Sequence, residues 1–379
     1  MAEPLKNMYN QAYLDDLAAA VTADFPLFDR AGFFGRINDG RWEERALKER
    51  MRHIVESLHP GLPGEYSQAL TILRKTAPRL GNYGFENMIF PDYVSLYGLD
   101  EWAISIPALE QFTQLISAEF AVRPFIVKDL SRMMAQMQRW ATHENASVRR
   151  LASEGCRPRL PWGMGLPSLQ ADPAPILPIL ELLKDDPAET VRRSVANNLN
   201  DIAKDHPQTV IAVLARWQAE DGQSLSPELD SKTGSEMTWI INHALRTLVK
   251  KGDPDALALL GYPRDPAVLV RHLALEPEQV PSGGELKITF EIQSLSQAEQ
   301  KLMVDYIVYL MRANGRQTPK VFKLTKRTLA PGERFTIHKK HSFRPVTTRK
   351  YYPGEHAIEI QVNGKRFGRE AFVLAAEQD

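Results

Sequence analysis

The chain carries one short segment in which an acid stands among arginines at helical spacing. Arg150, Glu154 and Arg157 occupy positions i, i+4 and i+7, so a helix would place them on one face. A carboxylate beside guanidinium groups stays ionised, and a fixed carboxylate can stabilise positive charge that develops on a sugar ring. Arginine in turn makes forked hydrogen bonds with phosphate. The pattern favours a reaction at a cationic centre on a negatively charged polymer.

A similar arrangement returns later in the sequence. One Val-Arg-Arg segment starts at Val148 and a second starts at Val191, 43 positions further on. A period of roughly 40–47 residues is typical of HEAT-like repeats, in which two helices form each unit. In the second copy Arg193 and Asn197 take the places of Arg150 and Glu154. Stacked units would set these helices side by side and form one polar, largely basic surface.

Helices must position this surface, and apolar residues at helical spacing predict them over the first two thirds of the chain. The predicted helices cover 13–22, 42–57, 65–80, 107–121, 123–140, 146–157 and 175–184, with others at the second Val-Arg-Arg segment and after Pro207, and a third, weaker repeat unit runs through 237–260. Residues 81–100 are rich in aromatic residues and glycine, which indicates a connection. We count roughly three to four HEAT-like units from about 100 to 262, capped by the N-terminal helices.

After Pro266 the hydrophobic period changes to two. Apolar and polar residues alternate over 286–292, 302–311 and 356–362, and Asn363-Gly364 predicts a type I′ hairpin turn. Turn sequences divide the last ~110 residues into about seven strands, which favours an immunoglobulin-like sandwich without paired cysteines. The predicted fold is therefore an all-α HEAT-like repeat solenoid, wound as a right-handed superhelix, followed by this β-sandwich. We place the first domain at 1–263, with capping helices at 1–100, and the second at 268–375.

Positive charge is concentrated in one part of the β region. The formal net charge of the chain is zero, so overall composition does not point to a nucleic-acid partner. Residues 312–350, however, contain a single acid, Glu333. Their twelve basic residues are Arg312, Arg316, Lys320, Lys323, Lys326, Arg327, Arg334, Lys339, Lys340, Arg344, Arg349 and Lys350. Such a bias would attract a polyanion, and the alternative is a solvated face of a small sandwich.

A predicted hairpin tip opens this basic run. Arg312, Asn314, Gly315 and Arg316 belong to its turn, and Lys320 follows on the next strand. A tip that contains glycine is narrow enough to enter a minor groove, where arginine and asparagine can contact sugars and base edges. The alternative is a plain hairpin turn without a ligand.

Composition excludes several classes of protein. The single cysteine, Cys156, excludes a disulfide framework and a cysteine-based zinc site, and we expect it in the core. The N-terminus lacks the pattern of a signal peptide, and no window approaches 18 apolar residues, so we expect a cytoplasmic protein. We expect no metal and no cofactor.

Four segments together resemble a known family. Residues 46–58, 117–126, 143–162 and 191–207 are similar to the AlkC branch of the AlkC/AlkD DNA alkylation-repair glycosylases. The resemblance covers roughly residues 1–262, and the β region is similar to the immunoglobulin-like tail of some AlkC members. It implies a monofunctional glycosylase of base excision repair. Such an enzyme hydrolyses the N-glycosidic bond of cationic bases, 3-methyladenine and 3-methylcytosine, in duplex DNA and leaves an abasic site. The resemblance also implies that the base is not swung into a deep pocket.

The resemblance and the residue pattern together rank the candidate catalytic acids. Glu119 comes first, because it is predicted within an apolar helix and an aspartate of the AlkD branch corresponds to it. Glu154 comes second, and Asp201 third with Asn197. The AlkD branch has a tryptophan where this chain has Asn197, so we expect Trp162 to stack on the sugar or base instead. The alternatives are a surface glutamate, an Arg150–Glu154 surface pair and a tryptophan that fills a gap between repeats.

Arginines of the repeats are candidate phosphate contacts. Adjacent arginines cannot share a face, so some residues of the two Val-Arg-Arg segments must point away, and we favour Arg150 and Arg193. Arg157 and Arg159 complete the predicted DNA-binding set of the helical region. The predicted partner is double-stranded DNA with alkylated bases, bound by a monomer. The rival hypotheses are a non-catalytic HEAT scaffold, which would present apolar concave ridges, and a nucleic-acid-binding protein without catalysis.

Overall fold

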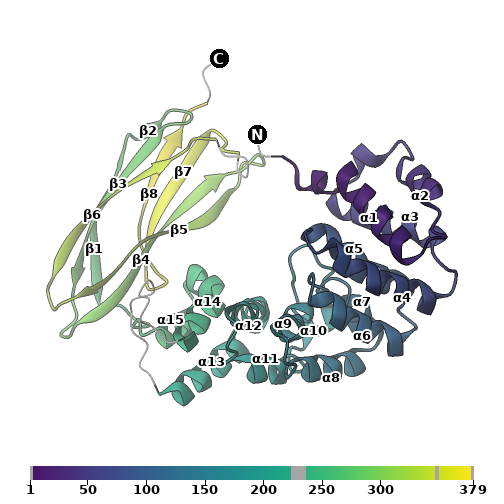
Figure 1. The fold of residues 1–379 in the computed structure, drawn as a ribbon. Helices are drawn as coiled ribbons and strands as arrows, with labels where there is room; N and C mark the ends of the chain where they lie inside the picture. The colour runs from purple at the N-terminus through teal and green to yellow at the C-terminus, as the bar shows by residue number, and fades with distance from the viewer. Residues whose placement is uncertain (1–2, 223–235, 346–349, 377–379) are drawn as a thin grey trace. The chain divides into compact units, whose positions relative to one another are not determined.

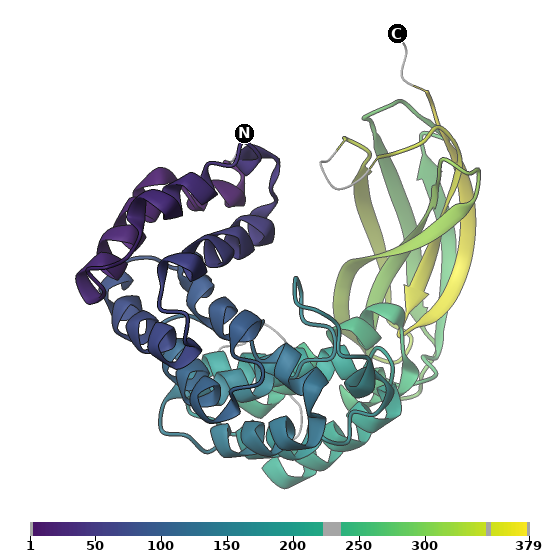
Figure 2. The same cartoon turned by 90° about the vertical axis from the view of Figure 1, so that its right-hand side faces the viewer.

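The computed structural model describes residues 3–222, 236–345 and 350–376, and in these ranges helices precede strands. Figures 1 and 2 show this order, with the helices coloured from purple to teal and the strands from green to yellow. The predicted class, repeated helices followed by a β-sandwich, is confirmed. The chain divides into two compact units, Met1–His206 and Pro207–Asp379. Within the three described ranges, no helix has the length and apolar character of a membrane span.

In residues 3–206, the described part of the first unit, the regular elements are all helices. Its α-helices are α1 (Gln11–Asp24), α2 (Arg30–Ile37), α3 (Leu47–Leu58), α4 (Tyr66–Thr76), α5 (Ile89–Tyr97), α6 (Trp102–Thr113), α7 (Arg123–Lys128), α8 (Leu130–Trp140), α9 (Ala146–Gly155), α10 (Pro167–Ala171), α11 (Leu177–Leu183) and α12 (Glu189–Ile202). Short 3-10 helices are η1 (Leu5–Met8), η2 (Trp42–Glu44), η3 (His59–Gly61), η4 (Ala77–Leu80) and η5 (Phe85–Met88).

The two Val-Arg-Arg segments form the helices α9 and α12, which pack against each other as the repeat predicts. Asn145 caps α9 by accepting a hydrogen bond from the Ser147 amide at 2.8 Å. Val148, Leu151 and Val195 are fully buried between helices, and each such side chain stabilises the fold by roughly 1.5–3 kcal/mol. Helix α8 packs on α9 and α11 packs on α12, which completes two helix pairs.

Several predictions for the helical region need correction. The helix predicted over 107–121 ends at Thr113, because side-chain hydroxyls in the following turns bond nearby backbone amides and compete with helical hydrogen bonds. The helix predicted over 123–140 is interrupted at Asp129, whose carboxylate caps α8 by accepting from the Arg132 amide. The connection predicted over 81–100 contains α5, where Pro91 stands in the first turn and needs no amide hydrogen.

The second unit joins three helices to a β-sandwich. Its elements are α13 (Pro207–Asp221), α14 (Glu236–Lys251), α15 (Pro254–Leu259), β1 (Val268–Glu276), β2 (Gln279–Val280), β3 (Glu285–Ser294), β4 (Gln300–Met311), β5 (Gln317–Leu329), β6 (Arg334–Ser342), β7 (Gly354–Val362) and β8 (Lys365–Leu374). The described ranges thus contain eight strands where about seven were predicted. A three-stranded sheet has the order β1-β3-β6, and a five-stranded sheet has the order β2-β8-β7-β4-β5.

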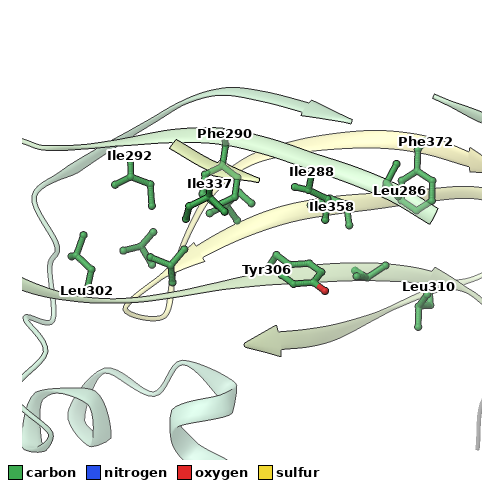
Figure 3. Close-up of a cluster of buried hydrophobic side chains, with 14 of the residues drawn as sticks. Leu286, Ile288, Phe290, Ile292, Leu302, Tyr306, Leu310, Ile337, Ile358 and Phe372 are labelled. Atoms are coloured by element: carbon green, nitrogen blue, oxygen red, sulfur yellow. The ribbon is translucent and has the colours of Figure 1, made fainter. Parts of the chain in front are cut away.

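Alternating side chains of both sheets fill the sandwich. Phe290 and Ile337 from one sheet meet Tyr306 and Ile358 from the other in a buried cluster (Figure 3). The period of two in the sequence therefore marks inward-facing positions. At the predicted hairpin turn, Asn363 and Gly364 both have positive φ, 46° and 82°, as a type I′ turn requires.

That same hairpin packs against the end of α14 within the second unit. A Cβ on Gly364 would lie 2.1 Å from the carbonyl oxygen of Gly252, so the two backbones meet without side chains. The Asn363 amide donates to the carbonyls of Pro263 and Lys301 at 3.2 and 3.1 Å. The last helices and the sandwich are therefore joined by close packing as well as by the chain itself.

Candidate active site

Glu119 lies in the turn between α6 and α7, on the surface of the first unit. The Ser117 hydroxyl donates to its Oε2 at 2.7 Å, and Nη2 of Arg150 donates to the same oxygen at 2.9 Å. Arg150 also donates to the Ser117 hydroxyl at 3.0 Å, which closes a three-residue ring of hydrogen bonds. Among the described residues, none donates to Oε1. Because its side chain is 16% exposed, Glu119 is fixed in place yet reachable.

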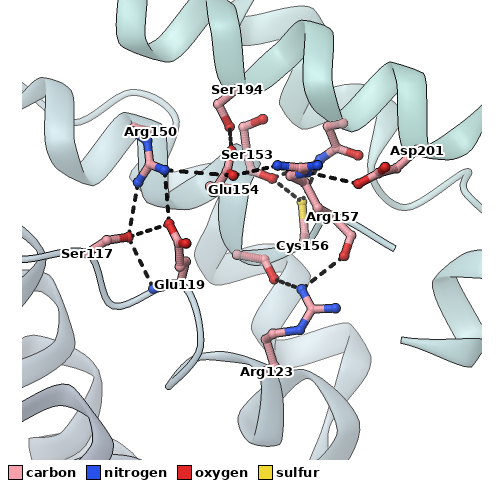
Figure 4. A network of polar contacts seen from close by, with 12 residues as sticks. Ser117, Glu119, Arg123, Arg150, Ser153, Glu154, Cys156, Arg157, Ser194 and Asp201 are labelled. Carbon is pink, nitrogen blue, oxygen red and sulfur yellow. Dashed lines mark hydrogen bonds and ion pairs between the residues drawn. The ribbon is translucent and has the colours of Figure 1, made fainter. Parts of the chain in front are cut away.

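Glu154 lies on α9 and faces α12. Its Oε2 accepts a hydrogen bond from the Ser194 hydroxyl of α12 at 2.6 Å. Its Oε1 accepts from Nη1 of Arg157 at 2.6 Å and lies 3.7 Å from Nη2 of Arg150. Glu119 and Glu154 therefore flank the same guanidinium group, as Figure 4 shows. Glu119 and Glu154 are 35 positions apart in the sequence, and both lie next to the side chain of Arg150.

Asp201 continues this network on α12. Nε of Arg157 donates to its Oδ2 at 2.9 Å, and Lys204 donates to its Oδ1 at 2.7 Å. Burial alone would lower the pKa of Arg157, but Glu154 and Asp201 outweigh it and raise that pKa. The result is a continuous line of alternating charges from Glu119 to Lys204.

Arg157 is placed differently from what a phosphate contact requires. Its side chain is only 8% exposed, its Nε donates to Asp201 and its Nη1 donates to Glu154. The sequence pattern set Arg157 on the same face as Arg150 and Glu154, but that face lies between α9 and α12 at this point. The geometry gives Arg157 the task of holding Glu154 and Asp201 in place.

Trp162 projects from an anchored loop after α9. Its side chain is 61% exposed, and its backbone has φ of 62°, in the left-handed region. The buried guanidinium of Arg123 ties this loop down by donating to the carbonyls of Gly155, Arg157 and Met164 at 2.6–2.9 Å. Burial lowers the pKa of Arg123 to about 10. The loop thus presents a large flat side chain from a fixed base.

The remaining arginines divide between inter-repeat links and exposed ends. Arg149 donates to the Asp186 carboxylate, and Arg192 donates to the carbonyls of Asp186 and Pro187, so both face away from the acids. Arg159 makes a two-pronged pair with Asp205 at 2.9 and 2.8 Å, and its side chain is 40% exposed. These bonds explain why Arg149 and Arg192 do not share the surface on which Arg150 lies.

Arg193 and Asn197 lie one turn apart on α12, with Asp201 one turn further on. Arg193 is exposed and forms an i, i+4 pair with Glu189 at 2.5 Å. Asn197 is half-buried. The second repeat copy therefore carries an exposed cation and an amide where the first copy carries Arg150 and Glu154.

The basic hairpin tip of the second unit is formed as predicted between β4 and β5. Arg312, Asn314, Gly315 and Arg316 are exposed, Gly315 has φ of 74°, and the Asn314 side chain accepts from the Arg316 amide at 3.1 Å. The ammonium of Lys320 lies 5.6 Å from the centre of the Phe322 ring. Arg349, counted in the basic run, lies outside the described residues.

Sequence reasoning missed the residues that orient the acids. Ser117, Ser194 and Arg123 belong to no motif in the sequence. Ser117 bonds Glu119, two positions away, but Ser194 bonds Glu154 across 40 positions and Arg123 bonds Gly155 across 32 positions. Offsets close to the repeat period could have pointed to Ser194, which is the neighbour of Glu154 across the α9–α12 pair. In the described ranges, no three histidine, cysteine, aspartate or glutamate side chains are grouped as metal ligands would be.

Comparisons with known proteins match both parts of the chain. Residues 116–246 match the family described as DNA alkylation repair enzyme, and residues 269–376 match the C-terminal Ig-like domain of the uncharacterised protein YhaZ. The chain is 43% identical over 361 residues to YhaZ of Bacillus subtilis strain 168, covering 95% of this chain and 96% of that protein. A solved structure, Pseudomonas fluorescens alkylpurine DNA glycosylase AlkC bound to DNA with an abasic site analogue, is 41% identical. The match covers 99% of this chain and 100% of that one, with a TM-score of 0.89.

Proposed function

The chain belongs to the AlkC-type DNA alkylation repair glycosylases, and from this membership we propose that it is a monofunctional glycosylase for alkylated bases in duplex DNA. Its substrates would be cationic bases, 3-methyladenine first and 3-methylcytosine second, and its product an abasic site. The observation that carries the proposal is that two carboxylates, those of partly exposed Glu119 and buried Glu154, flank the guanidinium of Arg150.

The chemistry of such a base sets what the protein must supply. An alkylated base already carries positive charge, so it leaves without being protonated, and the sugar develops oxocarbenium character. A carboxylate held ~4 Å from that cation at an effective dielectric constant of about 20 stabilises it by roughly 4 kcal/mol. That corresponds to about three decades in rate. Oε1 of Glu119 is the oxygen we assign to this role, since Ser117 and Arg150 both bond Oε2.

Arg150 has to leave the two carboxylates before they can face a sugar cation. In the free protein it neutralises both Glu119 and Glu154, and its side chain is 30% exposed. A DNA phosphate is negatively charged, as the carboxylates are, and it can accept two hydrogen bonds from the guanidinium. We propose that binding of DNA transfers Arg150 to phosphate, which leaves the charge of Glu119 uncompensated only when substrate is present, while Arg157 still holds Glu154.

The other candidate residues support this centre. Asp201 acts through Arg157, which it holds against Glu154 at 2.6 Å, so its role is to orient Glu154. Trp162 would stack on the lesion or its sugar, and Asn197 would contact the same nucleotide. Arg159 and Arg193 are exposed enough to exchange their glutamate or aspartate partners for phosphate.

The basic hairpin gives a second point of contact with DNA. Its exposed tip, with Arg312, Asn314 and Arg316, is narrow enough for a minor groove, and Lys320 would add a phosphate contact. We expect a monomer that acts on the DNA of the cytoplasm. The division into domains at 1–263 and 268–375 stays part of this proposal.

Release of free base from methylated duplex DNA tests the proposal directly. Chromatography should show 3-methyladenine released by the wild-type protein, with strand breaks only after alkali treatment. A protein that binds the duplex without releasing any base would support the non-catalytic alternative. Immediate strand cleavage would contradict the monofunctional assignment.

A further inference from the structure

One lysine of the N-terminal helices reaches the loops around the candidate active site. Lys48, in the first turn of α3, donates a hydrogen bond from its Nζ to the carbonyl oxygen of Trp162 at 2.8 Å. The same ammonium lies 4.6 Å from the centre of the Phe120 ring. Phe120 is the immediate neighbour of Glu119. A single cation therefore touches both the turn that carries one candidate acid and the loop that carries the exposed indole.

The backbone of Trp162 explains why an external contact is useful there. A φ of 62° is uncommon for any residue with a side chain and is a marked outlier for one as bulky as tryptophan. Such conformations persist only where the surroundings over-determine them, and they gather at functional sites. Arg123 fixes the loop on both sides of Trp162, whereas Lys48 bonds the carbonyl of Trp162 itself.

The surroundings of Lys48 argue against a purely structural role in α3. Helix α3 is anchored by its own apolar face, where Met51, Ile54, Val55 and Leu58 are buried. Lys48 lies half-buried on another part of the helix, and this burial lowers the pKa of its ammonium. The nearby Asp92 carboxylate partly offsets the cost of desolvating the charge, and the Trp162 carbonyl and the Phe120 ring add to this compensation.

We propose that Lys48 is a positioning residue of the glycosylase, which holds the Trp162 carbonyl and the Phe120 ring so that the indole and Glu119 stand in a fixed relation. The N-terminal helices then complete the site in addition to capping the repeats. This inference rests on the proposed function, but its test includes a measurement on the free protein.

Kinetics provide the first test. Lys48→Met keeps the length of the side chain and removes the ammonium, and we expect single-turnover release of 3-methyladenine to fall about tenfold, the size of one hydrogen bond from a charged donor. Lys48→Arg keeps a donor and a cation over the ring, so it should restore the rate to within about threefold of wild type. Lys6→Met is the matched control, because Lys6 also donates to a backbone carbonyl of this region, that of Glu43 at 2.6 Å.

A double-mutant cycle separates action through Trp162 from general loosening. If Lys48 positions the indole, Lys48→Met should slow the reaction far less in a Trp162→Ala background than in wild type. Additive effects of the two substitutions would overturn the proposal, and so would a Lys6→Met variant that slows as much as Lys48→Met.

Fluorescence of the free protein keeps this inference distinct from the proposed function. The indole contribution of Trp162, taken as the difference between wild type and Trp162→Phe, should change its acrylamide quenching in Lys48→Met but not in Lys6→Met. Unchanged quenching contradicts the positioning role whether or not any base is released. A changed quenching with no base release by wild type would instead contradict the glycosylase assignment alone.

Discussion

Glu119→Gln is the substitution that tests the candidate site most cleanly. Glutamine keeps the shape of the side chain, and its carbonyl oxygen can still accept hydrogen bonds from Ser117 and Arg150, which both act as donors. Only the negative charge is lost. Because the Glu119–Arg150 pair is partly exposed, its loss should change the free energy of unfolding by no more than about 1 kcal/mol.

The expected effect on the reaction is much larger. A carboxylate at ~4 Å from the developing cation contributes roughly 4 kcal/mol at an effective dielectric constant of about 20, which is about a thousandfold in rate. The assay is single-turnover release of 3-methyladenine from methylated duplex, with enzyme in excess, together with thermal unfolding of the same preparations. Binding to DNA with an abasic site should be retained, since the substitution removes no cation.

Glu110→Gln is the matched control for this experiment. Glu110 lies on α6, and its Oε2 accepts a hydrogen bond from Nε1 of Trp140 at 2.7 Å, away from the network around Arg150. It should change the rate by less than about threefold. Glu154→Gln is a less clean probe, because Glu154 is only 7% exposed and its loss leaves the buried Arg157 with one carboxylate. A Glu119→Gln enzyme that retains the wild-type rate would refute the reasoning.

Three further predictions test other parts of the molecule. Gly364→Ala would place a methyl group against the Gly252 carbonyl and should destabilise the protein by about 2–4 kcal/mol, measured by thermal unfolding. Gly332→Ala, where the site is open, should cost only about 1–2 kcal/mol for its positive φ. Replacing both Arg312 and Arg316 by alanine should lower the slope of log K against log salt by about two, and an unchanged slope would exclude the hairpin from the interface. Burial raises the pKa of the Cys156 thiol to about 12, so iodoacetamide should label it only in unfolded protein. The stability that the buried, protonated thiol contributes is complete below about pH 8 and is lost as pH rises toward the folded pKa. Cys156→Ala should remove this dependence of the free energy of unfolding on pH.

The repeat and the strand pattern could be predicted because both are periodic. Val148 and Val191 occupy equivalent buried positions on α9 and α12, and the alternation around Phe290 marks the inward face of a sheet. The spacing of apolar residues within one helix or strand identifies its buried face, and this spacing can be read from a short stretch of sequence. The turn at Glu119 escaped prediction, because hydroxyl groups of Thr113 and Ser117 end the helix where the apolar pattern would have continued it.

The partners of each charge were harder to predict than its position. Arg150 and Arg157 are equivalent by helical spacing, yet Arg150 is turned to the surface at Glu119 while Arg157 is enclosed between Glu154 and Asp201. The difference comes from their neighbours, because Arg150 donates to Ser117 and Glu119 in the turn after α6, whereas Arg157 donates to Asp201 of α12. A helical wheel contains no information about the neighbouring helix, so spacing alone could not separate the two roles.

The two repeat copies differ in that α9 carries a buried acid, Glu154, where α12 carries an amide, Asn197. If Asn197 were an acid, as Glu154 is, α12 would carry two adjacent carboxylates with Asp201, and Arg157 and Lys204 could not balance both along with Glu154. With an amide at 197 the buried line stays neutral from Glu154 to Lys204, and Glu119 stands at its open end beside Arg150. The charge that becomes uncompensated when Arg150 turns to phosphate is therefore that of Glu119, with Glu154 still held by Arg157. This ordering predicts a greater loss of rate from Glu119→Gln than from Asn197→Ala, although the repeat pattern alone sets Asn197 at the position equivalent to Glu154.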